Sequence, residues 1–279
     1  MPSLNLAANN TSQQKVWRYN PKYSLNCINN HIEYLSQHHS SDYMSSTTNG
    51  EWYENSWTLH FWIKPVEHVA SHKDPLLFYG DSANDGITVY LDTNQYIIVQ
   101  LDSGTHTSVS ALTDSVWSNV VVVYDAKNDT LKIYINGSED YSQGSVSYDP
   151  DITNTLLNIM YAPYLNIPAG ESFSTRLFNG RFFEVAIYNF ALTNLNVTKL
   201  YNGGDATDLR RLGIGNPQGW WSPGNHYNDW LGTAWTPNSG KIYNIMNPFN
   251  YEGDSLLQRL NVANLIDDSS DIGEDIPSS

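Results

Sequence analysis

The sequence predicts an all-β protein, an antiparallel β-sandwich or jelly roll, and three observations predict it. Aromatic residues make up 13% of the 279 residues and charged residues only 15%, fewer than long amphipathic helices usually carry. Apolar residues recur at every second position in many short runs. Clusters of turn-forming residues separate these runs at the spacing of sandwich strands. The length suits one large sandwich with extensions.

The strands follow a polar N-terminal segment. Residues 1–24 are rich in asparagine and suit an extended arm. From residue 31 onward apolar residues alternate with polar ones, most clearly from Trp57 to Lys64, where four apolar side chains share one face and Pro65 ends the run. This run predicts a half-buried strand. The same pattern predicts further strands over 31–35, 76–79, 87–91, 96–101, 116–124, 131–135, 156–160 and 181–188.

One short helix interrupts the strands near their end. Thr193 can cap its N-terminus, and Asn202-Gly203-Gly204 supplies residues that tolerate the left-handed conformation of a helix end. The helix is therefore expected over residues 193–201.

The amino-acid composition of the chain changes after the helix. Tryptophans there stand among glycine, proline and asparagine with little strand periodicity, and the last residues are acidic. The acidic residues are expected to be solvated and mobile. We therefore expect four parts, namely an N-terminal arm (1–24), a sandwich domain (25–204), an aromatic-rich extension (205–262) and an acidic tail (263–279).

Charge and composition exclude several classes of protein. The chain has 29 acidic and 14 basic residues and a formal net charge of −15, so phosphate backbones and anionic membranes would repel it. We expect no nucleic-acid partner.

Cys27 is the only cysteine and cannot form an internal disulfide. The N-terminus lacks a basic start followed by an apolar stretch, and the longest apolar run, 120–124, is far shorter than a bilayer span. We expect no Sec signal peptide and no membrane insertion.

Five motifs along the predicted strands occur in an order that resembles a known family. The motifs are Trp57-Thr58-Leu59-His60-Phe61-Trp62-Ile63-Lys64-Pro65, Leu77-Phe78-Tyr79-Gly80, Val116-Trp117-Ser118-Asn119-Val120 continuing to Asp125, Leu131-Lys132-Ile133-Tyr134-Ile135-Asn136-Gly137, and Phe178-Asn179-Gly180-Arg181 continuing to Tyr188. Over residues 25–204 the chain is similar to laminin-G-like, concanavalin-A-like lectin domains. The resemblance implies two packed antiparallel sheets and a lectin-like module.

A second resemblance concerns the residues that follow the sandwich. Segments 201–209, 216–225 and 245–247 resemble the joint after laminin-G-like domains in structural proteins of marine tailed bacteriophages. This resemblance implies a protein of the virion, synthesised in the cytoplasm of the host.

One turn offers candidate metal ligands. Residues 80–86 read Gly-Asp-Ser-Ala-Asn-Asp-Gly, and oxygen ligands clustered in a turn suit calcium. Laminin-G-like domains often hold calcium at a loop rim, so the resemblance implies that Asp81 and Asp85, with Asn84 as a further ligand, bind calcium. The alternative is that Asp, Asn and Gly simply make the turn.

Four tryptophans are the candidate ligand-binding residues. Exposed indole rings can stack on sugar rings, so Trp220, Trp221, Trp230 and Trp235 could bind a glycan. Alternatively, they anchor the extension against its own sandwich or against a neighbouring subunit. We favour packing.

The sequence lacks the motifs of glucanases, serine hydrolases and zinc proteases. Related glucanases carry alternating carboxylates on one strand, whereas Glu139 and Asp140 are adjacent and should point to opposite faces, and Glu184 is alone on its strand. No Gly-x-Ser-x-Gly occurs, and His68 and His72 lack the His-Glu-x-x-His order of zinc proteases. We therefore predict a protein that is not an enzyme.

Three functions remain, in this order. The first is a virion structural protein, such as a capsid decoration, a knob, or a tail or fibre component, which contacts other virion proteins, copies of itself or host-surface glycans. The second is a free carbohydrate-binding or adhesion module. The third is a glycoside hydrolase of the concanavalin-A-like class. The fold cannot choose among them, because function belongs to sites on a shared scaffold.

Overall fold

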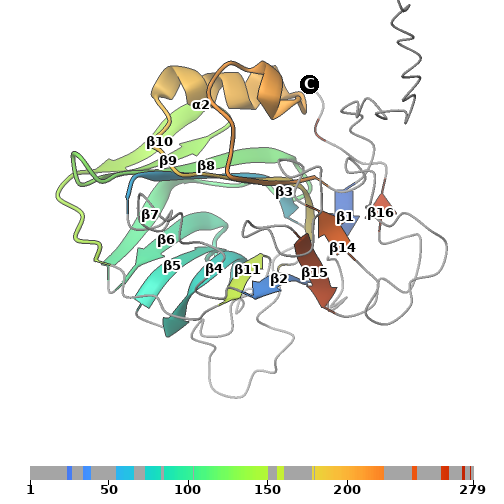
Figure 1. Cartoon of the computed structure of the whole chain (residues 1–279), viewed down its shortest axis with the longest axis horizontal. Helices are drawn as coiled ribbons and strands as arrows, with labels where there is room; N and C mark the ends of the chain where they lie inside the picture. The colour runs from blue at the N-terminus through green and yellow to red at the C-terminus, as the bar shows by residue number, and fades with distance from the viewer. Residues whose placement is uncertain are drawn as a thin grey trace, which may run out of the picture.

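The computed structural model confirms the antiparallel β-sandwich (Figure 1). Two eight-stranded sheets pack face to face, and one short helix lies over the outer face of one of them. The structure describes residues 24–26, 34–38, 55–65, 73–82, 85–102, 104–149, 156–159, 178, 180–222, 241–243, 259–263, 272–273 and 277.

Sheet A carries the helix. Its central strands pair in antiparallel fashion, with β3 between β8 and β12. In order, its strands are β10 (Ser138–Gln143), β9 (Thr130–Ile135), β8 (Ser118–Asp125), β3 (Trp57–Pro65), β12 (Gly180–Tyr188), β1 (Ser24–Asn26) and β16 (Ile272–Gly273), and β13 (Gly219–Trp221) pairs with β12 beside β1.

Sheet B packs on the other face of sheet A. Its two ends are β14 and β7, which belong to distant parts of the chain. In order, its strands are β14 (Lys241–Tyr243), β15 (Arg259–Ala263), β2 (Tyr34–His38), β11 (Leu156–Ile159), β4 (Asp74–Ser82), β5 (Asp85–Leu91), β6 (Tyr96–Leu101) and β7 (Gly104–Ala111).

The main core lies between the two sheets. The predicted apolar face of β3, from Trp57 to Ile63, packs there against β8 and sheet B. The opposite face of β3 is also buried, including His60 and Trp62. The expectation of a half-buried strand is therefore wrong for β3, because the helix and the segment after it cover the outer face of sheet A.

The helix, α2 (Asn194–Tyr201), confirms the sequence-based expectation. The Thr193 hydroxyl accepts a hydrogen bond from the Asn196 amide at 3.3 Å, and Asn202 adopts the left-handed conformation at the C-terminus. Val197 and Leu200 pack on the outer face of sheet A. Within the described ranges, no helix has both the length and the apolar character that a bilayer crossing requires.

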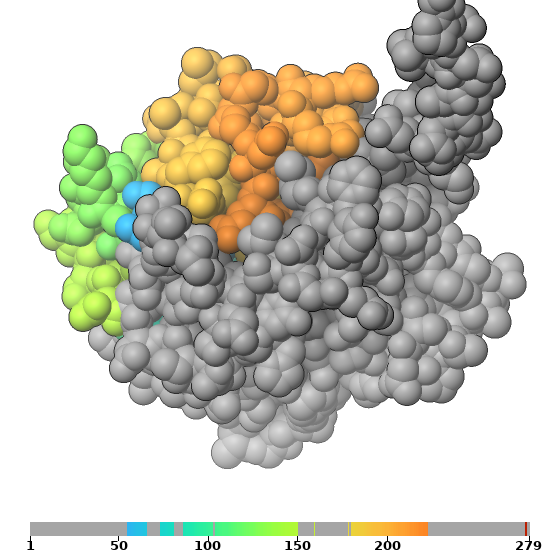
Figure 2. Space-filling model, viewed as in Figure 1, coloured from blue at the N-terminus to red at the C-terminus, as the bar shows by residue number. Residues whose placement is uncertain are grey.

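The segment after α2 completes this cover. It contains two short turns of 3-10 helix, η3 (Asn202–Gly204) and η4 (Leu209–Arg211), before it enters β13. Leu209 and Ile214 join Val197 and Leu200 in a second apolar cluster on sheet A. Figure 2 shows this segment and α2 side by side on one face of the molecule.

The described parts of the predicted extension and tail belong to the sandwich. β13 joins sheet A, β14 and β15 join sheet B, and β16 pairs with β1. The Ala206 amide also donates a hydrogen bond to the Pro277 carbonyl at 3.3 Å. Segments that we expected to extend from the domain or to be solvated therefore supply strands to it.

A tight hairpin places β10 at the end of sheet A. Asn136 and Gly137 join β9 to β10 with φ values of 51° and 75°, as a two-residue turn of type I′ requires. The Asn136 side chain accepts a hydrogen bond from the Asn119 amide at 2.9 Å, which fixes the turn against β8. A Cβ at residue 137 would lie 2.8 Å from the Tyr201 Cβ, so only glycine fits between the hairpin and α2.

Candidate functional site

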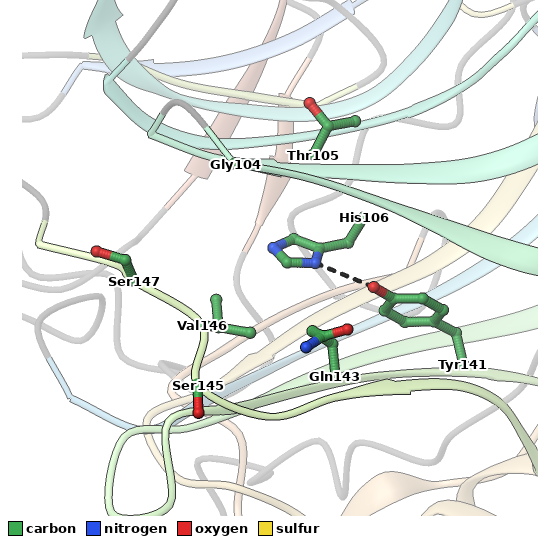
Figure 3. A pocket seen from close by; sticks show the side chains of 8 residues that line it. All are labelled: Gly104, Thr105, His106, Tyr141, Gln143, Ser145, Val146 and Ser147. Carbon is green, nitrogen blue, oxygen red and sulfur yellow. Dashed lines mark hydrogen bonds between the residues drawn. The ribbon is translucent and has the colours of Figure 1, made fainter.

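A pocket of about 310 Å³ opens where the two sheets end side by side (Figure 3). One wall is β7, the last strand of sheet B, and the other is β10, the last strand of sheet A, with the loop that follows it. We call this site the edge pocket. It is lined by Gly104, Thr105, His106, Tyr141, Gln143, Ser145, Val146 and Ser147.

Strand alternation selects the side chains that face the pocket. On β7, Gly104 and His106 are two residues apart and share one face, as Tyr141 and Gln143 do on β10. In Figure 3 the His106 imidazole reaches from β7 toward Tyr141 and Gln143. The four residues therefore meet from opposite walls.

One hydrogen bond spans the pocket. His106 Nδ1 lies 3.2 Å from the Tyr141 hydroxyl, and the two rings are 6.1 Å apart at an interplanar angle of 57°. Burial lowers the pKa of His106 below its ordinary value of 6.5. The imidazole is therefore uncharged at neutral pH, with one nitrogen that donates and one that accepts.

The edge pocket keeps hydrogen-bonding capacity that the protein does not fill. Among the described residues, His106 Nε2 and Gln143 Oε1 have no hydrogen-bond partner. His106 Nδ1 is bonded to the Tyr141 hydroxyl, and Gln143 Nε2 donates to the Gly144 carbonyl. Both groups can bind a polar ligand. The Tyr141 ring and the buried Val146 add an apolar surface beside them.

A second hollow, of about 590 Å³, lies between the outer face of sheet A and the start of α2. Its polar side chains already bind one another. Tyr134 donates to Asn194 at 2.6 Å, Lys132 pairs with Glu139 at 2.7 Å, and the Asn128 amide donates to Asp125 at 2.6 Å. This hollow is larger than the edge pocket, but these polar side chains in its lining are already engaged with the protein.

A buried polar cluster lies on the outer face of sheet A. Trp220 Nε1 donates to Glu184 Oε1 at 2.6 Å, the Asn119 amide nitrogen lies 2.8 Å from His60 Nε2, and all four side chains are fully buried. His60 Nδ1 and Glu184 Oε2 face each other at 4.0 Å. Burial raises the pKa of Glu184 to about 8 and lowers the pKa of His60 to about 3, so both are uncharged at neutral pH. Since no solvent reaches them, the cluster is structural.

The sequence places this chain in a family. Residues 38–198 match the Laminin_G_3 family of the concanavalin A-like lectin/glucanases superfamily, and this match covers more than half of the chain. The chain belongs to this family. The expected laminin-G-like fold is therefore confirmed, whereas the resemblance to phage proteins stays a prediction.

A solved structure shares the fold of this chain at low sequence identity. A proposed carbohydrate-binding protein of Bacteroides ovatus matches 92% of this chain with 15% identity and a TM-score of 0.57. The match covers 61% of that protein, so this chain spans about three fifths of its length. A heptameric, SAP-like pentraxin of Limulus polyphemus matches 64% of this chain and 81% of its own, with 16% identity and a TM-score of 0.45. No curated protein sequence matches the chain.

Two of the four candidate tryptophans lie inside the β-sandwich, on β13. Trp220 packs under α2 and Trp221 between the sheets, and neither ring is exposed at all. A sugar cannot stack on them, so the ligand-binding assignment does not suit these two residues and the packing interpretation does. Trp230 and Trp235 lie outside the described residues.

The predicted calcium ligands lie at the β4–β5 hairpin. Ser82 pairs with Asp85 there, so the backbones of Asp81 and Asp85 approach each other at one end of sheet B. Their carboxylates and the Asn84 amide have the donor chemistry that calcium prefers. The side chains of all three lie outside the described part of the chain, so the calcium site stays a prediction. Elsewhere in the described part, no group of three or more His, Cys, Asp or Glu residues could hold a metal ion.

Sequence reasoning missed the edge pocket because it missed both strands that form it. β7 and β10 are polar edge strands, and their exposed residues give no apolar alternation. Thr105, Thr107 and Val109, β-branched residues at alternate positions, were the strand signal in β7. The prediction that Glu139 and Asp140 point to opposite faces is confirmed, since Glu139 binds Lys132 while Asp140 binds β7.

Proposed function

We propose that this chain is a non-enzymatic carbohydrate-binding module and that the edge pocket is its binding site. One observation carries the proposal. The pocket combines uncharged groups that can still form hydrogen bonds, His106 Nε2 and Gln143 Oε1, with the half-buried ring of Tyr141.

This combination matches the chemistry of a sugar. The axial and equatorial hydroxyls of a sugar both donate and accept hydrogen bonds, and its C–H face packs on aromatic rings. The volume of about 310 Å³ lies at the lower end of the range for small-molecule sites, which suits the end of a glycan. The carbohydrate-binding role proposed for the Bacteroides ovatus protein agrees with this function, although the likeness itself concerns the fold.

Two features support a role without catalysis. Glycoside hydrolysis generally needs a pair of carboxyl groups beside the scissile bond, and none of the eight residues that line the pocket carries one. Glu184, whose raised pKa would suit a general acid, is fully buried and bonded to Trp220. A glycoside hydrolase is therefore the weaker proposal.

The test is binding of the full chain to a glycan array, compared with its His106→Ala variant. Removing the imidazole removes one hydrogen bond to the ligand and the bond to Tyr141, so we expect the affinity to fall by up to about tenfold. Val109→Ala is the matched control, because Val109 is on the same strand, is 70% exposed and does not line the pocket.

Two results would contradict the proposal. One is the absence of binding to any glycan by the folded chain. The other is equal binding by the wild-type chain and the folded His106→Ala variant, which would place the site elsewhere.

As a second function, we propose that the module belongs to a virion, where it contacts other virion proteins or copies of itself. What supports this proposal is the sequence resemblance of residues 201–209 and 216–225 to the joint in phage structural proteins. Leu209 and Trp220 from these segments pack on sheet A, so this joint is part of the domain and not a loose linker.

Mass spectrometry of purified particles tests the virion proposal. We expect peptides of this chain at a constant ratio to the capsid protein, in particles synthesised in a host cytoplasm. Reproducible absence from particles would rule the proposal out, and glycan binding by the isolated chain would stand independently.

A further inference from the structure

Gly104 controls the space in front of His106. It begins β7, two residues before His106 on the same face of the strand. A Cβ at residue 104 would lie 3.5 Å from His106 Nε2 and 3.4 Å from the Leu101 carbonyl oxygen. Both are ordinary van der Waals distances, so alanine would fit the fold, and its methyl group would lie against the one imidazole nitrogen that has no partner among the described residues.

The backbone also tolerates this change. Gly104 is not among the glycines with positive φ, so an alanine there would not be strained. Glycine at this position is therefore not required by the fold. Its effect is to leave His106 Nε2 open to a ligand.

The pocket offers no cationic side chain to a negatively charged ligand. None of its lining residues is Lys or Arg, and the imidazole is uncharged at neutral pH. The chain as a whole carries a formal charge of −15, which repels anions at low salt. A carboxylate or sulfate would lose its hydration without gaining a cation. A sugar hydroxyl, in contrast, can donate to or accept from Nε2 in either tautomer of the imidazole.

From these observations we infer that the edge pocket selects uncharged sugars over anionic ones, and that Gly104 is the residue that determines access to it. The inference rests on the proposed carbohydrate-binding function and names the ligand class of the same site.

The first experiment uses the wild-type chain alone. Its probes are neutral laminarin and agarose oligosaccharides beside sulfated carrageenan and uronate-containing alginate oligosaccharides, on one array at neutral pH and low salt. We expect binding to neutral oligosaccharides only. Binding to the sulfated or uronate oligosaccharides with equal or higher affinity would overturn the inferred ligand class.

The second experiment compares Gly104→Ala with Gly144→Ala. Residue 144 follows the pocket residue Gln143, and a Cβ there would meet no atom within 4 Å, so this variant adds the same methyl group outside the pocket. We expect Gly104→Ala to lower the affinity for the neutral oligosaccharide by up to about tenfold, as the loss of one hydrogen bond would. Gly144→Ala should bind like the wild type, and both should keep the wild-type melting temperature.

The outcomes separate this inference from the proposed function. If His106→Ala weakens binding but Gly104→Ala does not, the binding site stands and the role of Gly104 is wrong. If neither variant weakens binding, the site itself is wrong. If Gly104→Ala lowers both the melting temperature and the affinity, its effect is structural and the access role is overturned, while the array still decides the ligand class.

Discussion

Two neighbouring tryptophans show how one residue step changes the environment of a side chain. Trp220 and Trp221 follow each other on β13, so their rings lie on opposite faces of sheet A. Both are fully buried. Trp220 donates its indole N–H to Glu184 at 2.6 Å, whereas the indole N–H of Trp221 has no partner among the described residues.

The pair allows a matched measurement of one buried hydrogen bond. Trp220→Phe and Trp221→Phe remove the same atoms from buried sites, but only the first leaves a buried carboxyl oxygen without its donor. We expect Trp220→Phe to lower the free energy of unfolding by about 1–3 kcal/mol more than Trp221→Phe. Urea denaturation of both variants measures the difference. Equal losses would show that the Glu184 contact adds no stability.

At the scale of elements, side-chain hydrogen bonds connect the edge strands β10 and β7 of the two sheets. The Asp140 carboxylate on β10 accepts hydrogen bonds from the β7 amides of Val109 at 2.6 Å and Ser110 at 3.1 Å. The hydrogen bond between His106 and Tyr141, inside the pocket, is a second connection between these strands. A carboxylate that occupies backbone amides also keeps an edge strand from pairing with another chain.

Replacing Asp140 tests this connection. In Asp140→Ala the amides of Val109 and Ser110 lose their acceptor, so we expect faster hydrogen exchange at both and a loss of about 1 kcal/mol of stability. Asp140→Asn keeps one acceptor oxygen and should retain most of the protection. Unchanged exchange in the alanine variant would mean that the carboxylate does not hold β7.

At the scale of the whole molecule, two buried groups make stability depend on pH. The pKa of Glu184 rises from 4.5 to about 8 on folding, so its contribution is fully present below pH 4.5 and is lost as the pH rises toward 8. The pKa of His60 falls from 6.5 to about 3, so its contribution is fully present above pH 6.5 and is lost as the pH falls toward 3. Between pH 4.5 and 6.5 the two slopes oppose each other. Stability is therefore expected to decline on either side of this window.

The Glu184→Gln variant tests whether Glu184 causes the loss of stability at alkaline pH. The amide imitates the protonated carboxyl and still accepts from Trp220, so we expect a smaller decline in the free energy of unfolding between pH 6.5 and pH 8 than in the wild type. Glu139→Gln makes the same substitution at an exposed position and serves as the control. A wild-type slope in Glu184→Gln would show that another group titrates.

The fold was largely predictable and the pocket was not. Apolar alternation from Trp57 to Ile63 and the further apolar runs marked most strands of the core, and Thr193 and Asn202 marked the ends of α2. β7 and β10 carry polar residues on their exposed faces, so no periodic pattern distinguished them from loops. The carboxyl group of Glu184 could not be assigned either, because its partner Trp220 lies 36 residues away.

The sequence by itself determined the fold class, the helix and the absence of a paired-carboxylate motif, because hydrophobic periodicity and capping are local properties of the chain. Only the tertiary structure decided that Trp220 and Trp221 are buried and that His106, Gly104 and Tyr141 share a pocket. Burial depends on what covers a face, and the pocket depends on two sheets that end at the same edge. Both arise from contacts between segments far apart in the chain, which no local pattern encodes.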